Sequence, residues 1–90
     1  MEIKVVKEDK NYLEIEIQGE EHTLGNLIAG LLRRVNGVTF VTYNKPHPLI
    51  DTIYIKILTD GTITPKEALL KAIQQGEELA NRFINDVKNL

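Results

Sequence analysis

The feature that most constrains the fold of this chain is a helical pattern at its end that is too long for a globule of this size. Apolar residues recur at three- and four-residue intervals from Ala68 to Leu90, which is the period of an amphipathic helix. A helix over residues 65–90 would be about 39 Å long at ~1.5 Å per residue. A compact globule of 90 residues is only about 31 Å across. The sequence therefore predicts a helix that overhangs its own domain.

The start of this helix is encoded by four consecutive residues, 64–67. Thr64 is suited to the N-cap, Pro65 to the first helical position and Glu67 to a capping box. The apolar pattern continues beyond the part that the chain's own core can bury. A large exposed apolar patch on a soluble protein usually marks a surface for a partner. We therefore expect something outside the chain to cover the helix from Leu79 onward.

The remaining segments predict four strands and a shorter helix. The first two strands flank a polar loop and form a predicted β-hairpin, in which Leu13, Ile15 and Ile17 alternate with polar residues and indicate a single buried side. The last two are rich in β-branched and aromatic residues. The strands are expected at residues 2–7, 12–18, 38–43 and 52–59. We expect one domain over residues 1–90, of the α+β class and in the order ββαββα, with a small, mainly antiparallel sheet, two helices on one face and a long C-terminal helix.

Between the two strand pairs, residues 23–35 predict an amphipathic helix. Thr23 is the expected N-cap, Arg33 and Arg34 lie in the last turn, where the helix dipole favours cations, and Gly37 closes the helix in a left-handed conformation. The apolar face of this helix is formed by Leu24, Leu27, Ile28, Leu31, Leu32 and Val35.

Small residues interrupt this helix at Gly25, Ala29 and Gly30. A glycine inside a helix costs about 1 kcal/mol relative to alanine, so its presence needs a reason. Tolerance at an exposed turn is one explanation. We favour the other, that small residues let another backbone approach closely, because the leucines on the opposite face suffice to seat the helix on its own sheet.

The composition excludes several classes of function. The chain has no cysteine and no serine, which removes disulfides, thiolate metal sites and serine or cysteine hydrolase mechanisms. The two histidines, His22 and His47, lack a second ligand at metal-site spacing. No apolar run approaches the 18 or so residues of a membrane span. We expect a cytoplasmic protein with no metal or cofactor, which is not an enzyme in its own right.

Two other functions remain open from the residues alone. Arg33 and Arg34 could bind phosphate in a nucleic-acid-binding domain, although the formal net charge of -2 gives no general attraction to nucleic acid. Glu21, His22 and His47 could instead converge on a pocket of a small-ligand regulatory or enzymatic domain. More often, such residues are solvated loop positions beside a helix start.

Three segments together resemble a known motif. They are Glu-Glu-His-Thr-Leu-Gly-Asn-Leu at residues 20–27, Tyr43, and Pro-His-Pro-Leu at residues 46–49. This set resembles the α-motif of RNA polymerase assembly subunits, a family that includes the smaller α-like subunits of archaeal and eukaryotic polymerases and the dimerisation domain of bacterial α. The resemblance covers essentially the whole chain, without the inserted domain and the C-terminal DNA-binding domain of bacterial α, so direct contact with nucleic acid is not expected.

The resemblance implies a non-catalytic role in transcription. Members of this family pair with a larger α-like subunit, called D, and the pair then gathers small assembly subunits and the two largest subunits of DNA-directed RNA polymerase, a nucleotidyltransferase. Their helices form the pairing surface. Carried over to this chain, the resemblance places the partner interface at His22, Thr23, Leu24, Gly25, Asn26, Leu27, Ile28, Leu31, Leu32, Leu79, Phe83, Ile84 and Val87.

Overall fold

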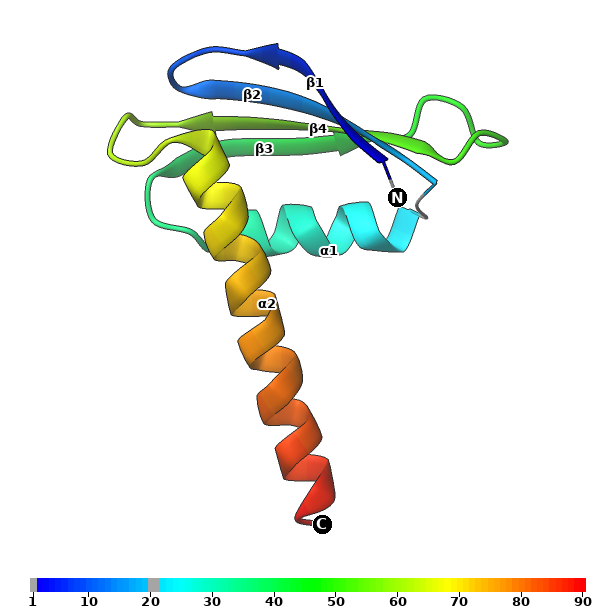
Figure 1. Ribbon diagram of the computed structural model, residues 1–90, viewed down its shortest axis with the longest axis vertical. Coiled ribbons are helices and arrows are strands. Elements are labelled where there is room, and N and C mark those ends of the chain that lie inside the picture. The colour runs from blue at the N-terminus through cyan, green and yellow to red at the C-terminus, as the bar shows by residue number, and fades with distance from the viewer. Residues whose placement is uncertain (1, 20–21) are drawn as a thin grey trace.

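The protein is represented by a computed structural model that describes residues 2–19 and 22–90, with the side chains of the first helix described from residue 25 onward. Its elements follow the predicted order (Figure 1). They are β1 (Glu2–Glu8), β2 (Tyr12–Gln18), α1 (His22–Leu32), β3 (Val38–Asn44), β4 (Thr52–Thr59) and α2 (Pro65–Lys88). The α+β class predicted from the hydrophobic periods is therefore confirmed.

The four strands form one antiparallel sheet in the order β1-β2-β4-β3. The strands β2 and β4 lie at the centre, where Ile15 pairs with Ile55 and Ile17 pairs with Ile53. Both helices lie on the same side of this sheet (Figure 1). Because β2 and β4 are flanked on both sides, their inward residues are well buried.

The core fills the space between the sheet and the two helices. Ile53, Ile55 and Ile57 of β4 are fully buried, as expected for alternate residues on one face of a central strand. From α1, Ala29 and Leu32 are fully buried, and α2 contributes two further fully buried alanines. Burying small residues from α2 lets this helix lie close to the sheet while adding little volume to the core.

The hairpin differs from its prediction in one respect. The inward side chains of β2 are buried, but those of β1 are not: Ile3 and Val5, which pair with Ile17 and Ile15, are 55% and 51% exposed. The helices lie across β2, β3 and β4, whereas β1 stands at the edge. Its inward apolar residues therefore remain uncovered.

The sequence predicted the end of α1 less accurately than the start of α2. The helix α1 includes His22 and ends at Leu32, so Thr23 lies inside it rather than at its cap, and Arg33 and Arg34 follow it. The bonds from Arg34 N–H to Leu31 carbonyl and from Val35 N–H to Leu32 carbonyl are both 3.1 Å long. These i to i−3 bonds tighten the chain into a turn. The helix therefore ends before the apolar pattern of the sequence does.

At the start of α2 the predicted N-cap at Thr64 is confirmed. The Thr64 hydroxyl oxygen accepts the Glu67 N–H at 3.2 Å, and the same hydroxyl donates to the Glu67 carboxylate at 2.9 Å. Pro65 occupies the first turn, where its missing N–H costs nothing.

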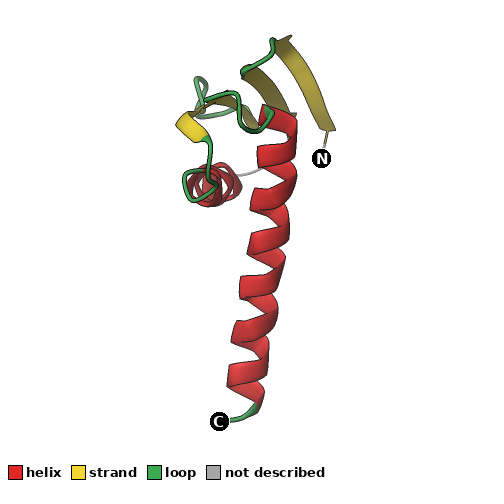
Figure 2. Ribbon diagram, turned by 90° about the vertical axis from the view of Figure 1, so that its left-hand side faces the viewer, coloured by secondary structure: helices red, strands yellow, loops and turns green. Residues whose placement is uncertain are grey.

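The helix α2 projects far beyond the sheet, as predicted (Figures 1 and 2). The molecule measures 45 × 37 × 17 Å and its radius of gyration is 14.2 Å, against about 12 Å for a compact chain of this length. Of the α2 residues, only Pro65, Ala68 and Ala72 are buried. The half of this helix that follows Gly76 is therefore exposed along its whole length.

Candidate protein interaction surface

An apolar groove of about 660 Å³ runs between α1, α2 and the inner side of β1 and β2. Its lining is almost wholly apolar, and Glu77 is the charged residue among those that form it. The side chains that stand most exposed in it are Ile3, Leu27, Ile73, Leu79 and Phe83. We refer to this feature as the apolar groove.

The groove lies where the two helices pack against each other and then diverge. They run in crossing directions, so that α1 is seen end-on beside α2 in Figure 2. At the contact, a Cβ placed on Gly76 would lie 2.9 Å from the Leu31 Cδ1 atom. Glycine at this position therefore allows Leu31 of α1 to pack directly against the α2 backbone. Beyond Gly76, the helix leaves the domain.

The part of α2 after Gly76 is exposed along its whole length. On it, Phe83 is 70% exposed, and Leu79, Ile84 and Val87 are each between 43% and 50% exposed. These four residues recur at helical spacing and form one stripe, which we call the distal stripe. The distal stripe continues the wall of the apolar groove away from the sheet.

The structure brings together part of the predicted partner interface and buries another part. Leu27 and Ile28 of α1 line the apolar groove with Leu79 and Phe83 of α2. Leu31 lines its floor, although only 9% of Leu31 is exposed. Ile84 and Val87 extend the distal stripe beyond the groove, and Asn26 is exposed on α1.

Other residues of that prediction belong to the chain's own core. Leu32 is fully buried, and Gly25 is also buried. A Cβ on Gly25 would lie 2.8 Å from the Ile53 Cδ1 atom and 3.1 Å from the Tyr43 ring. At Gly25 the close approach is therefore made by side chains of this chain's own sheet, and not by the backbone of another chain as we expected. His22, Thr23 and Leu24 lie in α1, but their side chains are outside the described part of the chain.

Sequence reasoning missed several residues that line the apolar groove. Ile3 enters it from β1, Ile73 from α2, and Gly76 forms the crossing point. The alternation of Ile3 and Val5 with charged residues was visible in the sequence. That pattern shows which side of a strand is apolar, but it does not show that no helix covers the strand.

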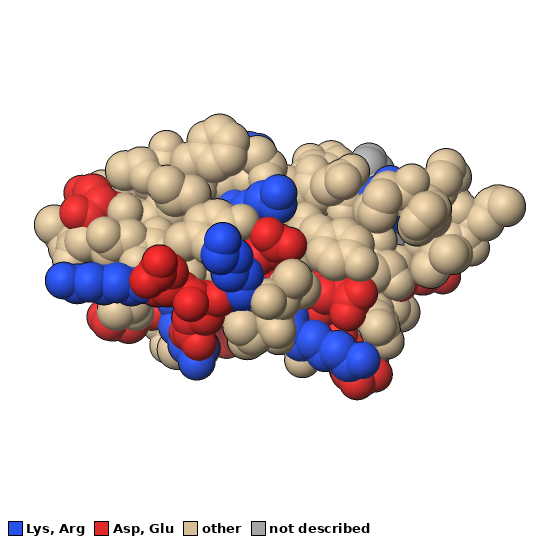
Figure 3. All heavy atoms as spheres, turned by 90° about the horizontal axis from the view of Figure 1, so that it is seen from above, with Lys and Arg blue, Asp and Glu red and all other residues tan. Residues whose placement is uncertain are grey.

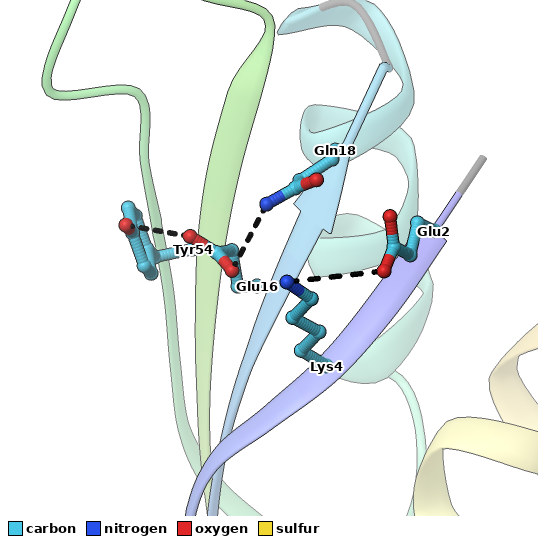
Figure 4. A network of polar contacts seen from close by, with 5 residues as sticks. All are labelled: Glu2, Lys4, Glu16, Gln18 and Tyr54. Carbon is cyan, nitrogen blue, oxygen red and sulfur yellow. Dashed lines mark hydrogen bonds and ion pairs between the residues drawn. The ribbon is translucent and has the colours of Figure 1, made fainter.

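Polar contacts gather on the opposite face of the sheet (Figure 4). The Tyr54 hydroxyl donates to Glu16 at 2.9 Å, and Gln18 donates to the same carboxylate at 3.4 Å. The bond to Glu16 raises the pKa of Tyr54 above its usual value. Seen from the end opposite the projecting helix, basic and acidic side chains alternate (Figure 3). This face is solvated and presents no continuous basic patch in that view.

Residues 2–19 and 22–90 contain no candidate metal-binding cluster and no candidate membrane-spanning helix. No cluster of three or more histidine, aspartate or glutamate residues in these segments could hold a metal ion. Neither described helix is long and apolar enough to cross a membrane. Glu21 lies outside the described residues, as does the side chain of His22, so the alternative in which these two converge with His47 falls outside the described part of the chain.

Comparison with known proteins shows the family of the chain. Residues 12–86 match the family model of the RNA polymerase Rpb3/Rpb11 dimerisation domain. The chain belongs to this family. It is 59% identical to the DNA-directed RNA polymerase subunit Rpo11 of Saccharolobus solfataricus, over 100% of this chain and 98% of that protein. It is 60% identical to Rpo11 of Sulfolobus acidocaldarius, with both chains fully covered.

A solved structure shows the same fold. DNA-directed RNA polymerase subunit L from Thermoplasma acidophilum superimposes with a TM-score of 0.85 at 19% identity, covering 98% of this chain and 86% of that one. The Rpb3/Rpb11-family chain described here is thus an RNA polymerase subunit with the subunit L fold. The resemblance inferred from residues 20–27, Tyr43 and residues 46–49 is confirmed.

Proposed function

We propose that this chain pairs with the larger α-like polymerase subunit, D, by burying the apolar groove and the distal stripe against that subunit's helices. The observation that carries the proposal is the largely apolar surface from Ile3 and Leu27 to Val87, which the chain leaves exposed. Burial of apolar area contributes roughly 25 cal/mol per Å² before the costs of association. A surface of this kind on a soluble protein serves a partner.

The pair would act as the platform for polymerase assembly. In this proposal it recruits the small assembly subunits first and the two largest subunits afterwards, in the cytoplasm. The chain itself would carry no catalysis, because its interaction surface holds apolar side chains and a single carboxylate, Glu77, and no acid–base pair. Direct contact with nucleic acid is not part of this role, and the mixed charges in Figure 3 agree with that.

The sharpest test places a charge where folding does not need an apolar side chain. Phe83 is 70% exposed on the distal stripe, so Phe83→Glu should leave the fold intact. In the complex, the new carboxylate would be desolvated without a partner, at a cost of several kcal/mol. We expect affinity for the D-like subunit, measured by titration calorimetry with the purified subunits, to fall at least a hundredfold.

Leu70→Glu is the matched control. Leu70 is 61% exposed on the same helix but does not line the apolar groove, so this variant adds the same charge away from the proposed surface. We expect it to bind as the unmodified chain does. Unchanged binding by Phe83→Glu, with circular dichroism like that of the parent, would remove the distal stripe from the interface.

Leu31→Glu would be a poorer probe, although the resemblance also places Leu31 in the partner interface. Leu31 is only 9% exposed and belongs to the core, so a glutamate there would unfold the chain whether or not it binds a partner. A substitution at Phe83 separates an effect on binding from an effect on folding, and a substitution at Leu31 does not.

A further inference from the structure

The two halves of α2 are held in different ways. Before Gly76, the helix packs on the sheet through Ala68 and Ala72, which are fully buried, and through half-buried Leu69. At Gly76 the helix packs closely against Leu31 of α1. From residue 77 to residue 90 every residue is exposed. The helix therefore passes from a packed half to an exposed half near Gly76.

The second half is also a weak helix by composition. Three asparagines and an aspartate occupy residues 81, 85, 86 and 89, and these residue types favour caps and turns over helix interiors. Within residues 77–90, the described side chains form no ion pair or side-chain hydrogen bond. A helix of about 12–15 residues without tertiary packing is marginal in water. Gly76 adds a flexible joint at its base.

We infer that α2 consists of two separately stable units, and that the distal unit, residues 77–90, opens locally in the free chain and becomes a fixed helix only when a partner covers it. Opening the distal unit exposes little apolar area that is not already exposed, so little burial opposes it. Opening residues 65–75 would uncover the core. The free energies of local opening should therefore differ sharply across Gly76.

The part of this inference that concerns ordering by a partner rests on the proposed function. When a partner covers Leu79 and Phe83, it must also order the backbone that carries them, and part of the interaction free energy is spent on that ordering. Affinity then depends on the helix propensity of residues that the partner does not touch. This dependence separates coupled folding from docking onto a rigid helix.

The first experiment is amide hydrogen exchange on the isolated full-length chain, at concentrations where sedimentation shows a monomer. We expect the amides of residues 69–75 to be protected as strongly as those of β2 and β4. The amides of residues 80–90 should exchange within about tenfold of the rates of an unstructured peptide. Equal protection on both sides of Gly76 would overturn the inference, and this result does not depend on any partner.

The second experiment changes helix propensity without changing the distal stripe. Asn81 and Asn85 each lie two positions from Phe83, which is about 200° around a helix, so both point away from Phe83. The double variant Asn81→Ala with Asn85→Ala should raise distal protection about tenfold and tighten binding of the D-like subunit by a similar factor. The matched variant with glycine at both positions should lower both quantities about threefold.

The outcomes distinguish this inference from the proposed function. If the alanine variant raises protection but leaves affinity unchanged, coupled folding is wrong while pairing stands. If the D-like subunit binds none of these chains, the proposed function fails, and the exchange pattern of the free chain still decides whether α2 has two units.

Discussion

Thr59, at the end of β4, carries a buried hydroxyl whose oxygen has no hydrogen-bond partner among the described residues. Its side chain is only 5% exposed, and its backbone N–H donates to the Asn11 carbonyl at 2.9 Å. The backbone is thus satisfied while the side-chain oxygen is not. A buried polar atom without a partner costs about 1–3 kcal/mol.

Thr59→Val should therefore stabilise the chain by about 1 kcal/mol, because valine keeps the β-branched shape and removes the orphaned oxygen. The measurement is the free energy of unfolding in urea. Thr39→Val is the control, since the exposed Thr39 hydroxyl donates to the Leu58 carbonyl at 3.3 Å and its loss should give no gain. If Thr59→Val destabilises the chain, an ordered water must satisfy the hydroxyl.

At the scale of a single element, α1 contains two glycines with opposite surroundings. Gly25 is packed against Ile53, which is fully buried, and against the Tyr43 ring. Gly30 is exposed, and a Cβ there would meet nothing within 4 Å. The same substitution at these two positions thus separates helix propensity from packing.

Gly25→Ala should destabilise the chain by about 1–3 kcal/mol, because its methyl group would force α1 away from a side chain that has no room to move. Gly30→Ala should stabilise it by up to about 1 kcal/mol through helix propensity alone. Thermal melts of the two variants check both signs. A gain at Gly25 would mean that α1 can shift on the sheet without loss of packing.

The helix α1 also shows what could not be predicted from the sequence. The apolar period located α1, but it did not distinguish Leu32, which is buried in the core, from Leu27, which stands 58% exposed in the apolar groove. Both lie on the apolar face of one helix. Which of them meets the sheet depends on the rotation and crossing of α1 and α2, and this is decided by contacts such as Gly76 with Leu31, far apart in the sequence.

For the whole molecule, the length of α2 was predictable because it needs only local signals. Thr64, Pro65 and Glu67 encode the start, and the apolar period encodes the extent. The uncovered side of β1 was not predictable, because the strand order β1-β2-β4-β3 is a property of long-range pairing. The groove needs both features, so the sequence indicated its distal wall and missed the contribution of Ile3.

The projecting helix also has a consequence for how quickly the chain is degraded in the cell. In a newly made copy, the exposed distal stripe around Phe83 is accessible to chaperones and proteases until a partner covers it. Quality control would then remove surplus copies, so that the amount of the chain follows the supply of its partner. We expect the half-life of the chain, followed by pulse-chase labelling, to lengthen severalfold when the D-like subunit is co-expressed. An equal half-life with and without that subunit would show that the exposed stripe is not a degradation signal.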